Sequence, residues 1–208
     1  MTISGADLLD NIGSLLYDDS NEVWDDTLKV SLVNEALKVI VLARPDASVI
    51  TETFTVVADT PKQTIPATGI RLLDVLMNTN GAPIRKTTKE DLNDTIPAWT
   101  ITTGSAIETY AFDEENPTIF WLQPVPNSAL SIDISYSNTP TTFSAGSTSI
   151  GIAEIYVPAV KEYVLARCYG MPTSGVNLVK SANHMTAFYK IIGIKLQSDA
   201  ILQQVQEA

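Results

Sequence analysis

The segment from Trp24 to Ala47 has the hydrophobic pattern of a helix that is buried over most of its surface. Four polar residues fall at i, i+3, i+4 and i+7 and form one stripe of an α-helix: Ser31, Asn34, Glu35 and Lys38. Apart from Lys29, the residues around them from Leu28 to Leu42 are apolar. The apolar arc covers about two-thirds of the circumference, roughly twice what a surface helix needs. The pattern predicts a central helix covered by the first helix and by both C-terminal helices, or a helix with one face against another subunit.

A shorter helix precedes it, with Ser4 or Asp7 as the N-cap. Its predicted packing face is apolar: Leu8, Leu9, Ile12, Leu15 and Leu16. Residues 18–23 break the pattern, and Asp25 or Asp26 begins the second helix. Arg44 falls in its last turn, and Pro45 ends it.

The middle of the chain is rich in Thr, Val and Ile, and Pro and Gly interrupt it at short intervals. Strands are predicted over residues 49–57, 71–78, 83–87, 106–112, 118–124 and 130–138. Asn80-Gly81 is the strongest hairpin signal, and residues 89–94 predict a short helical turn. Short strands with frequent turns are typical of a small antiparallel sandwich or barrel.

The chain then returns to helical periodicity. Residues 152–169 predict a helix in which Pro158 fits the first turn or marks a kink. Six of its residues fall at helical spacing: Ile155, Ala159, Val160, Tyr163, Val164 and Arg167. A last helix starts near Val176, with a predicted packing face of Val179, Ala182, Phe188, Ile192 and Leu196.

These zones predict an α+β protein. Neither terminal zone has enough apolar surface to close a core alone, so residues 1–47 and 149–208 are expected to form one helical bundle. Residues 48–148 would be inserted into it as an antiparallel β-sandwich or barrel-like domain.

The charge narrows the functional classes. The 208 residues carry a formal charge of −11. This charge disfavours a protein that binds nucleic acid through its phosphates, but it is compatible with a protein that DNA only passes. Cys168 is the only cysteine, so no disulfide or cysteine metal site forms within one chain. The N-terminus lacks the pattern of a signal peptide, and no apolar run is long enough for a membrane span, so no membrane partner is expected.

Candidate chemistry is sparse. His184 is the only histidine and is interpreted as a packed or surface residue, and no phosphate-binding glycine loop is present. The acidic stretches 18–22 and 113–116 lack calcium-loop spacing and are interpreted as solvated turns. The aromatic residues of the strands are assigned to the core rather than to a stacking platform: Tyr110, Phe112, Phe120, Trp121 and Tyr136. We therefore predict no catalytic residue, no cofactor and no metal.

Several strings in one order resemble the head–tail adaptor (connector) proteins of short-tailed bacteriophages and prophages. They are WDDTLKVSLVNEALKVIVLARPDA, IPATGIRLLDVLMN, AWTITTG, YAFDEENPTIFWLQPVPNSALSIDISYSNTP, IAEIYVPAVKEYVLARCY and NHMTAF. The resemblance covers roughly residues 10–195. The chain departs from it after Tyr169, where the loop GMPTSG lacks the family's frequent acidic residue and so leaves Arg167 without that ion pair.

The resemblance implies a non-enzymatic virion protein at the head–tail interface that resides in the host cytoplasm during assembly. Such adaptors form a ring, typically a dodecamer, beneath the portal protein. They extend the channel through which DNA passes without specific binding, and they offer a surface to the tail nozzle or tail tube. A helical bundle with an inserted β domain is the fold that it implies.

A cyclic ring needs two different contact faces on each subunit. The residues expected to make subunit or portal contacts are Val30, Val41, Arg44, Arg71, Ile201, Leu202 and Val205. The last three, on an otherwise polar tail, are expected to dock on the portal. Some of the 24 acidic residues are expected to face the channel.

Three alternatives stay open. A phage β-sandwich module that binds a receptor or carbohydrate would keep aromatic residues exposed on the β zone. A tail-tube or stopper component of a long-tailed phage is close to the main interpretation. An enzyme would need His184.

Overall fold

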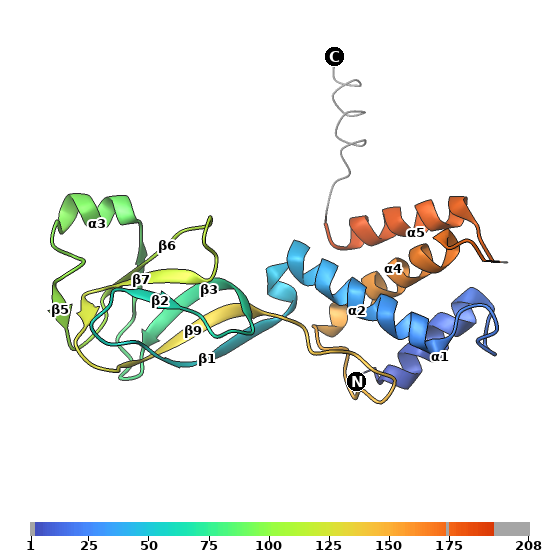
Figure 1. Cartoon of the computed structure of the whole chain (residues 1–208), viewed down its shortest axis with the longest axis horizontal. Coiled ribbons are helices and arrows are strands. Elements are labelled where there is room, and N and C mark those ends of the chain that lie inside the picture. Colours follow the sequence, from blue (N-terminus) through green and yellow to red (C-terminus); the bar gives the residue numbers. More distant parts are fainter. Residues whose placement is uncertain (1–2, 174, 194–208) are drawn as a thin grey trace, which may run out of the picture. The chain divides into compact units, whose positions relative to one another are not determined.

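The computed structural model describes residues 3–173 and 175–193 (Figure 1). These residues contain five α-helices and nine strands, so the predicted α+β class is confirmed. The helices are α1 (Gly5–Leu16), α2 (Asp26–Ala43), α3 (Lys89–Thr95), α4 (Val157–Gly170) and α5 (Leu178–Ile191), with 3₁₀ turns η1 (Pro45–Ala47) and η2 (Glu154–Tyr156). The strands are β1 (Val49–Thr55), β2 (Lys62–Thr64), β3 (Gly69–Asn78), β4 (Arg85–Thr87), β5 (Thr103–Gly104), β6 (Thr109–Phe112), β7 (Ile119–Gln123), β8 (Val125–Pro126) and β9 (Ser131–Asn138). No described helix combines the length and apolar character needed to cross a membrane.

The chain divides into two compact units. Val49–Thr139 form the β unit, and the described residues before and after it form the helical unit. The segment predicted as the insertion, 48–148, is longer than the β unit because residues 140–148 pack with the helices. The Gly5 N–H donates to the Ser147 carbonyl at 2.7 Å, and a side chain at Gly5 would collide with the carbonyl oxygen of Ser144.

Local capping fixes the ends of the first two helices. The Ser4 hydroxyl accepts from the Asp7 N–H at 3.2 Å, and the Asp25 carboxylate accepts from the Leu28 N–H at 2.7 Å. Tyr17 ends α1 in the left-handed region, with φ 58°. The α1 packing face is buried as predicted except for Leu15, which lies at the edge of that face and is 47% exposed.

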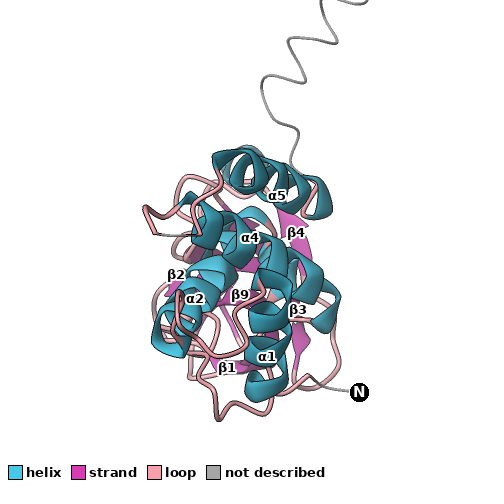
Figure 2. Cartoon of the chain, turned by 90° about the vertical axis from the view of Figure 1, so that its right-hand side faces the viewer, coloured by secondary structure: helices cyan, strands magenta, loops and turns pink. Residues whose placement is uncertain are grey.

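The heavily apolar α2 is covered from several directions within the helical unit (Figure 2). It contacts α4 and α1, whereas α5 packs chiefly on α4. Asn34, on the predicted polar stripe, is half-buried and binds the segment after the β unit. Its Oδ1 accepts from the Phe143 N–H at 2.8 Å, and its Nδ2 donates to the Phe143 carbonyl at 3.0 Å. The 2% exposed Phe143 helps to complete the cover that the sequence requires.

The C-terminal helices differ in part from the predicted faces. Pro158 lies in the first turn of α4, one of its two predicted places. Ile155 was predicted to lie within this helix but falls before α4, in η2, and is 78% exposed. Val179 is 72% exposed and Ala182 is also exposed, because α5 packs through a face that contains Phe188 and Ile192. The predicted Leu196 lies outside the described residues.

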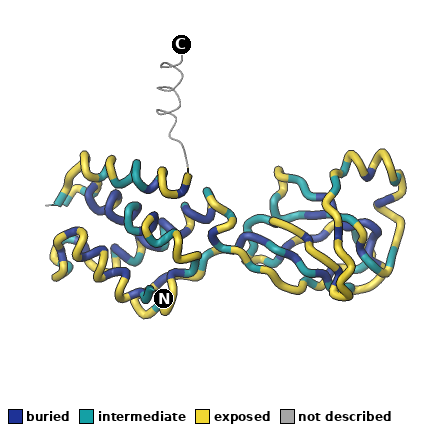
Figure 3. The backbone as a smooth tube through the Cα atoms, turned by 180° about the vertical axis from the view of Figure 1, so that it is seen from behind, coloured by how far each residue is buried: buried dark blue, intermediate teal, exposed yellow. Residues whose placement is uncertain are grey.

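Exposed positions recur along α5, the uppermost helix of the helical unit in Figure 3, whereas buried residues make up much of α2 and α4. The reason is that α5 has a neighbouring helix mainly on one side. Its N-terminal turn carries two large exposed side chains, Leu178 at 70% and Val179 at 72%.

The β unit contains two main sheets with strand orders β1-β9-β3 and β2-β7-β6-β4, and a short β5-β8 pair. β4 pairs parallel with β6 and β5 pairs parallel with β8, so the predicted all-antiparallel arrangement is wrong. After the predicted turn, where Gly81 has φ 86°, the chain forms a single bridge from Pro83 to Met77 before β4 moves to the other sheet. The described strands form no closed barrel.

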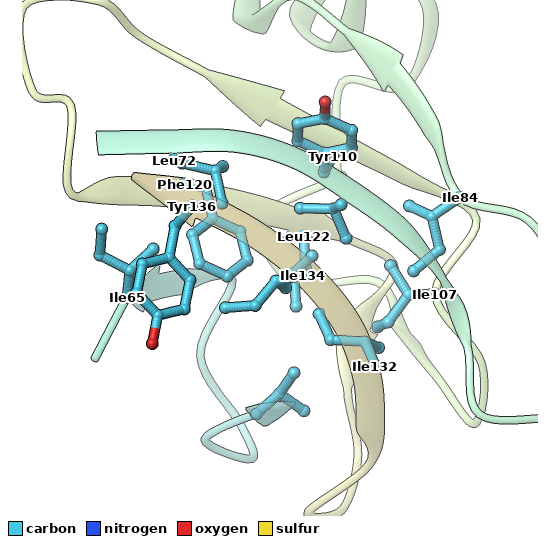
Figure 4. Packing of buried hydrophobic residues seen from close by; sticks show 12 residues of the cluster. Ile65, Leu72, Ile84, Ile107, Tyr110, Phe120, Leu122, Ile132, Ile134 and Tyr136 are labelled. Atoms are coloured by element: carbon cyan, nitrogen blue, oxygen red, sulfur yellow. The ribbon is translucent and has the colours of Figure 1, made fainter. Parts of the chain in front are cut away.

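One apolar cluster draws on both sheets (Figure 4). Its buried members are Val56, Ile65, Leu72, Val75, Ile84, Ile107, Tyr110, Phe120, Leu122, Ile132, Ile134 and Tyr136. In β3 the buried residues Leu72, Val75 and Asn78 are three apart rather than two, because a register shift against β9 separates each from the next. This explains why the β3 sequence does not alternate.

Candidate interaction surfaces

His184 makes a contact between two helices. Its Nδ1 lies 2.7 Å from Glu162 Oε2 on α4, and its ring stacks on Tyr169 with centroids 5.7 Å apart. The pair holds α5 against α4, which fits the interpretation of His184 as a packed residue. Among the described residues, no group of three or more His, Cys, Asp or Glu side chains is arranged to hold a metal ion.

The first acidic stretch is only partly the solvated turn that the sequence predicts. Asp18 is 6% exposed, and its carboxylate accepts from the N–H groups of Glu22, Val23 and Trp24 at 2.8–3.0 Å. The pKa of Asp18 is lowered, first by the Trp24 N–H. A carboxylate used in this way closes the turn before α2.

The turn at 113–116 is tied to its neighbours by charge. Asp113 accepts from the Glu115 N–H at 3.0 Å and from Lys89 Nζ at 3.2 Å, and these contacts lower its pKa in that order. Glu114 Oε1 lies 3.0 Å from Arg71 Nη2. Both partners of this second pair are substantially exposed, so the pair contributes little to stability.

A cleft of about 460 Å³ adjoins this turn, lined by residues that include Thr88, Lys89, Glu90 and Phe112. The Lys89 ammonium already contacts Asp113 and lies 3.4 Å from the centre of the Trp121 ring. The positive charge of Lys89 is therefore already paired with groups of the β unit itself.

The strand aromatics are largely core residues. Tyr110, Phe120 and Tyr136 are at most 2% exposed, as predicted, and Phe112 and Trp121 are half-buried. The buried phenols are satisfied: Tyr110 donates to Asp74 at 2.6 Å, and Tyr136 donates to Glu52 at 2.9 Å. Burial first, and then the carboxylate, raises the pKa of each phenol. A surface for stacking bases or sugars would need these rings exposed.

Arg44 is the C-cap of α2 rather than a residue of its last turn. It makes a two-point contact with Asp46, from Nε to Oδ1 at 3.1 Å and from Nη2 to Oδ2 at 3.2 Å. The Tyr156 hydroxyl also donates to Asp46, at 3.2 Å. Arg44 lowers the pKa of Asp46, mainly through the hydrogen bond. The cluster ties the end of α2 to η2 and leaves Arg44 exposed on the surface.

The other predicted contact residues are placed unevenly. Val30 is half-buried, and Arg71 lies on β3 beside Glu114. Val41 is 1% exposed and packs in the helical core, so it offers no surface; the adjacent Leu42 is 78% exposed instead. Ile201, Leu202 and Val205 lie outside the described residues.

The sequence analysis missed the most exposed apolar side chains of the helical unit. They are Tyr17, Leu42, Ile155, Leu178 and Val179, each at least 70% exposed. Periodicity assigns an apolar residue to a face but not to a neighbour, so it does not distinguish these residues from core residues. The absence of acidic residues after Glu162, up to residue 193, is the signal that could have marked α5 as a distinct surface.

Arg167 has an alternative to the missing loop acid. Its Nη2 lies 3.4 Å from Glu35 Oε2, which places the ion pair between α4 and the polar stripe of α2. Both side chains are about half exposed, so the contact orients the helices more than it stabilises them.

A comparison with known protein families gives a match that spans nearly the whole chain. A family model described as "SU10 adaptor protein" matches residues 1–206. No curated protein matches the sequence.

Proposed function

The chain belongs to the SU10 adaptor protein family, a structural family of bacteriophage proteins, and we propose on this basis that it is the head–tail adaptor of its virion. Copies of the chain form a ring beneath the portal, of twelve subunits by analogy with the resembled adaptors, extend the DNA channel and present a surface to the tail nozzle or tail tube. The observation that carries this proposal is the family match over residues 1–206.

The surface of the helical unit supports a role in assembly. Exposed apolar side chains are ordinary when they occur singly, but Leu178 and Val179 are adjacent on one turn of α5 and are both at least 70% exposed. Leu42 and Ile155 are each 78% exposed in the same unit. Burial of these side chains against neighbouring proteins in an assembly would account for their exposure in the single chain.

The charge supports passage of DNA rather than binding of DNA. Residues 49–139 contain eleven acidic and five basic residues, a formal charge of −6. An acidic bore repels phosphate, so DNA slides through it. In the assembled ring we expect acidic residues along the channel, and a basic bore would contradict this part of the proposal.

The C-terminal tail is proposed to dock on the portal through Ile201, Leu202 and Val205. Three apolar residues on an otherwise polar segment offer apolar surface that a partner can bury. Ending the chain at residue 197 should weaken attachment to the portal, and unchanged attachment would refute the docking role.

The experiment that tests the function measures the native mass of portal rings from the same virus, alone and with the purified chain. A stoichiometric gain in mass is expected whether or not the free chain is monomeric, because weak ring contacts need a template to offset the lost freedom. Tail-tube protein in place of portal is the control. Binding to the tail-tube protein and not to the portal would show that the chain is a tail component and not the adaptor.

A further inference from the structure

Acidic and basic residues are segregated within the helical unit. Residues 3–28 contain seven acidic residues and no Lys or Arg, whereas residues 163–193 contain Arg167, Lys180 and Lys190 and no acidic residue. The first stretch includes α1 and the second includes α5. The two helices therefore carry opposite charge.

These helices lie on different sides of the helical unit. α4 contacts both α1 and α5, and both views place α4 between them (Figures 1 and 2). One copy of the chain thus presents a negative helix on one side and a positive helix on another. Two unlike faces are what a head-to-tail contact between copies requires.

Along the outer face of α5, from its N-terminus to its C-terminus, the exposed side chains change from apolar to positively charged. The inner face packs through Phe188, and the Ser181 hydroxyl donates to the Ala166 carbonyl at 2.7 Å. On the opposite side Val179 is 72% exposed near the N-terminus, and Lys190 is exposed near the C-terminus. Lys180 is also exposed in the first turn, but its Nζ lies 4.9 Å from the centre of the Tyr169 ring on α4, so its charge is directed toward α4. Eleven residues separate Val179 from Lys190, about 16 Å along a helix.

Along the outer face of α1, from its N-terminus to its C-terminus, the exposed side chains change from negatively charged to apolar. Asp7 and Asp10 are exposed in its first half. At its end Tyr17 is 90% exposed, and Leu15, at the edge between the outer face and the packing face, is 47% exposed. From Asp7 to Tyr17 is ten residues, about 15 Å. The two faces therefore match in length and, when antiparallel, in the order of charge and apolar side chains.

We propose that the outer face of α1 in one copy of the chain packs antiparallel on the outer face of α5 in the next copy. Leu15 and Tyr17 then cover Leu178 and Val179, and Asp7 and Asp10 lie near Lys190. A parallel arrangement would set the acids against apolar side chains and leave Lys190 without an opposite charge. The contact deepens the adaptor function proposed above and rests on it, since it supplies the repeating contact of the ring.

Cross-linking with engineered cysteines tests this contact. Leu15→Cys and Val179→Cys replace exposed side chains, and the native Cys168 is 0% exposed and does not compete for reagent. A short bis-maleimide is added at about 1 mM protein, where a contact with a millimolar Kd is substantially occupied. The double variant should give a ladder of dimers, trimers and larger species, each single variant should stay monomeric, and a mixture of the two single variants should stop at dimers.

Charge reversal gives the specificity control. In the double-cysteine background, Asp10→Lys or Lys190→Glu alone should reduce the ladder to the level of the single-cysteine variants. The two reversals together should restore it, because each contact again joins opposite charges. Lys38→Glu, an exposed charge reversal on α2, should leave the ladder unchanged.

Other outcomes overturn the proposal. No ladder, either free or on portal rings, would exclude the contact, and dimers from one single-cysteine variant would mean that a face contacts itself. Cross-links from Val179→Cys to portal protein alone would assign α5 to the portal. A gain in portal mass without a ladder would leave the adaptor function standing and this contact refuted.

Discussion

Replacing Asn34 by Ala should loosen the segment that returns from the β unit to the helices. The Asn34 side chain makes two hydrogen bonds to the backbone of Phe143, at 2.8 and 3.0 Å, in the manner of a strand partner. Each contributes about 1 kcal/mol net, and leaving the partly buried Phe143 groups unpaired adds about 1–2 kcal/mol. The free energy of unfolding of the helical unit should fall by about 3–4 kcal/mol.

Urea unfolding followed by helical circular dichroism measures this loss, because most helical residues belong to the helical unit. Hydrogen exchange of the Phe143 amide provides the local measurement and should accelerate in the Asn34→Ala variant. Ser31→Ala is the matched control, since Ser31 lies on the same stripe one turn earlier and is exposed; it should change stability by less than about 0.5 kcal/mol.

The reasoning would be refuted if Asn34→Ala behaved like Ser31→Ala in both measurements. A loss of stability with unchanged exchange at Phe143 would also contradict it, because the destabilisation would then arise within α2 and not from the returning segment.

Three further predictions concern single side chains. The lowered pKa of Asp18 means that its carboxylate stabilises the folded state above the ordinary value of 3.8, and that this contribution is lost as pH falls through the folded pKa; Asp18→Asn should therefore flatten the acid side of a plot of melting temperature against pH. Phe120→Ala should cost about 3–5 kcal/mol in the β unit, seen as a lower urea midpoint in near-ultraviolet circular dichroism, because Phe120 is 0% exposed in a core shared by two sheets. Burial raises the pKa of the Cys168 thiol to about 12, so a thiol reagent at pH 7 should label it only at urea concentrations that unfold the helical unit, and rapid labelling of the native chain would contradict its burial.

Local features were predictable from the sequence because they depend on residues close together in the chain. The cap at Ser4, the end of α2 before Pro45 and the place of Pro158 in the first turn of α4 each follow from backbone chemistry. The strand predicted over residues 130–138 is β9, and Tyr136 is buried in it as predicted.

Pairing between distant segments could not be predicted in the same way. The parallel pairing of β4 with β6 depends on where the chain goes after Gly81, and the three register shifts of β3 depend on β9. β2, β5 and β8 are two or three residues long, too short for a periodic signal. Each of these features exists only because another strand supplies its hydrogen-bond partners.

For the candidate contact surfaces, too, some features follow from the residue pattern and others depend on tertiary packing. The residue pattern alone is enough to show that α2 is too apolar for an ordinary surface helix and that residues 163–193 lack acidic residues. Packing in three dimensions was needed to show that Val41 is buried while Leu42 is 78% exposed, and that Val179 faces away from α4. Periodicity gives the angle of a side chain about its own helix, whereas exposure depends on which neighbours pack around that helix. For α2 one of those neighbours, α4, comes from a segment more than a hundred residues away.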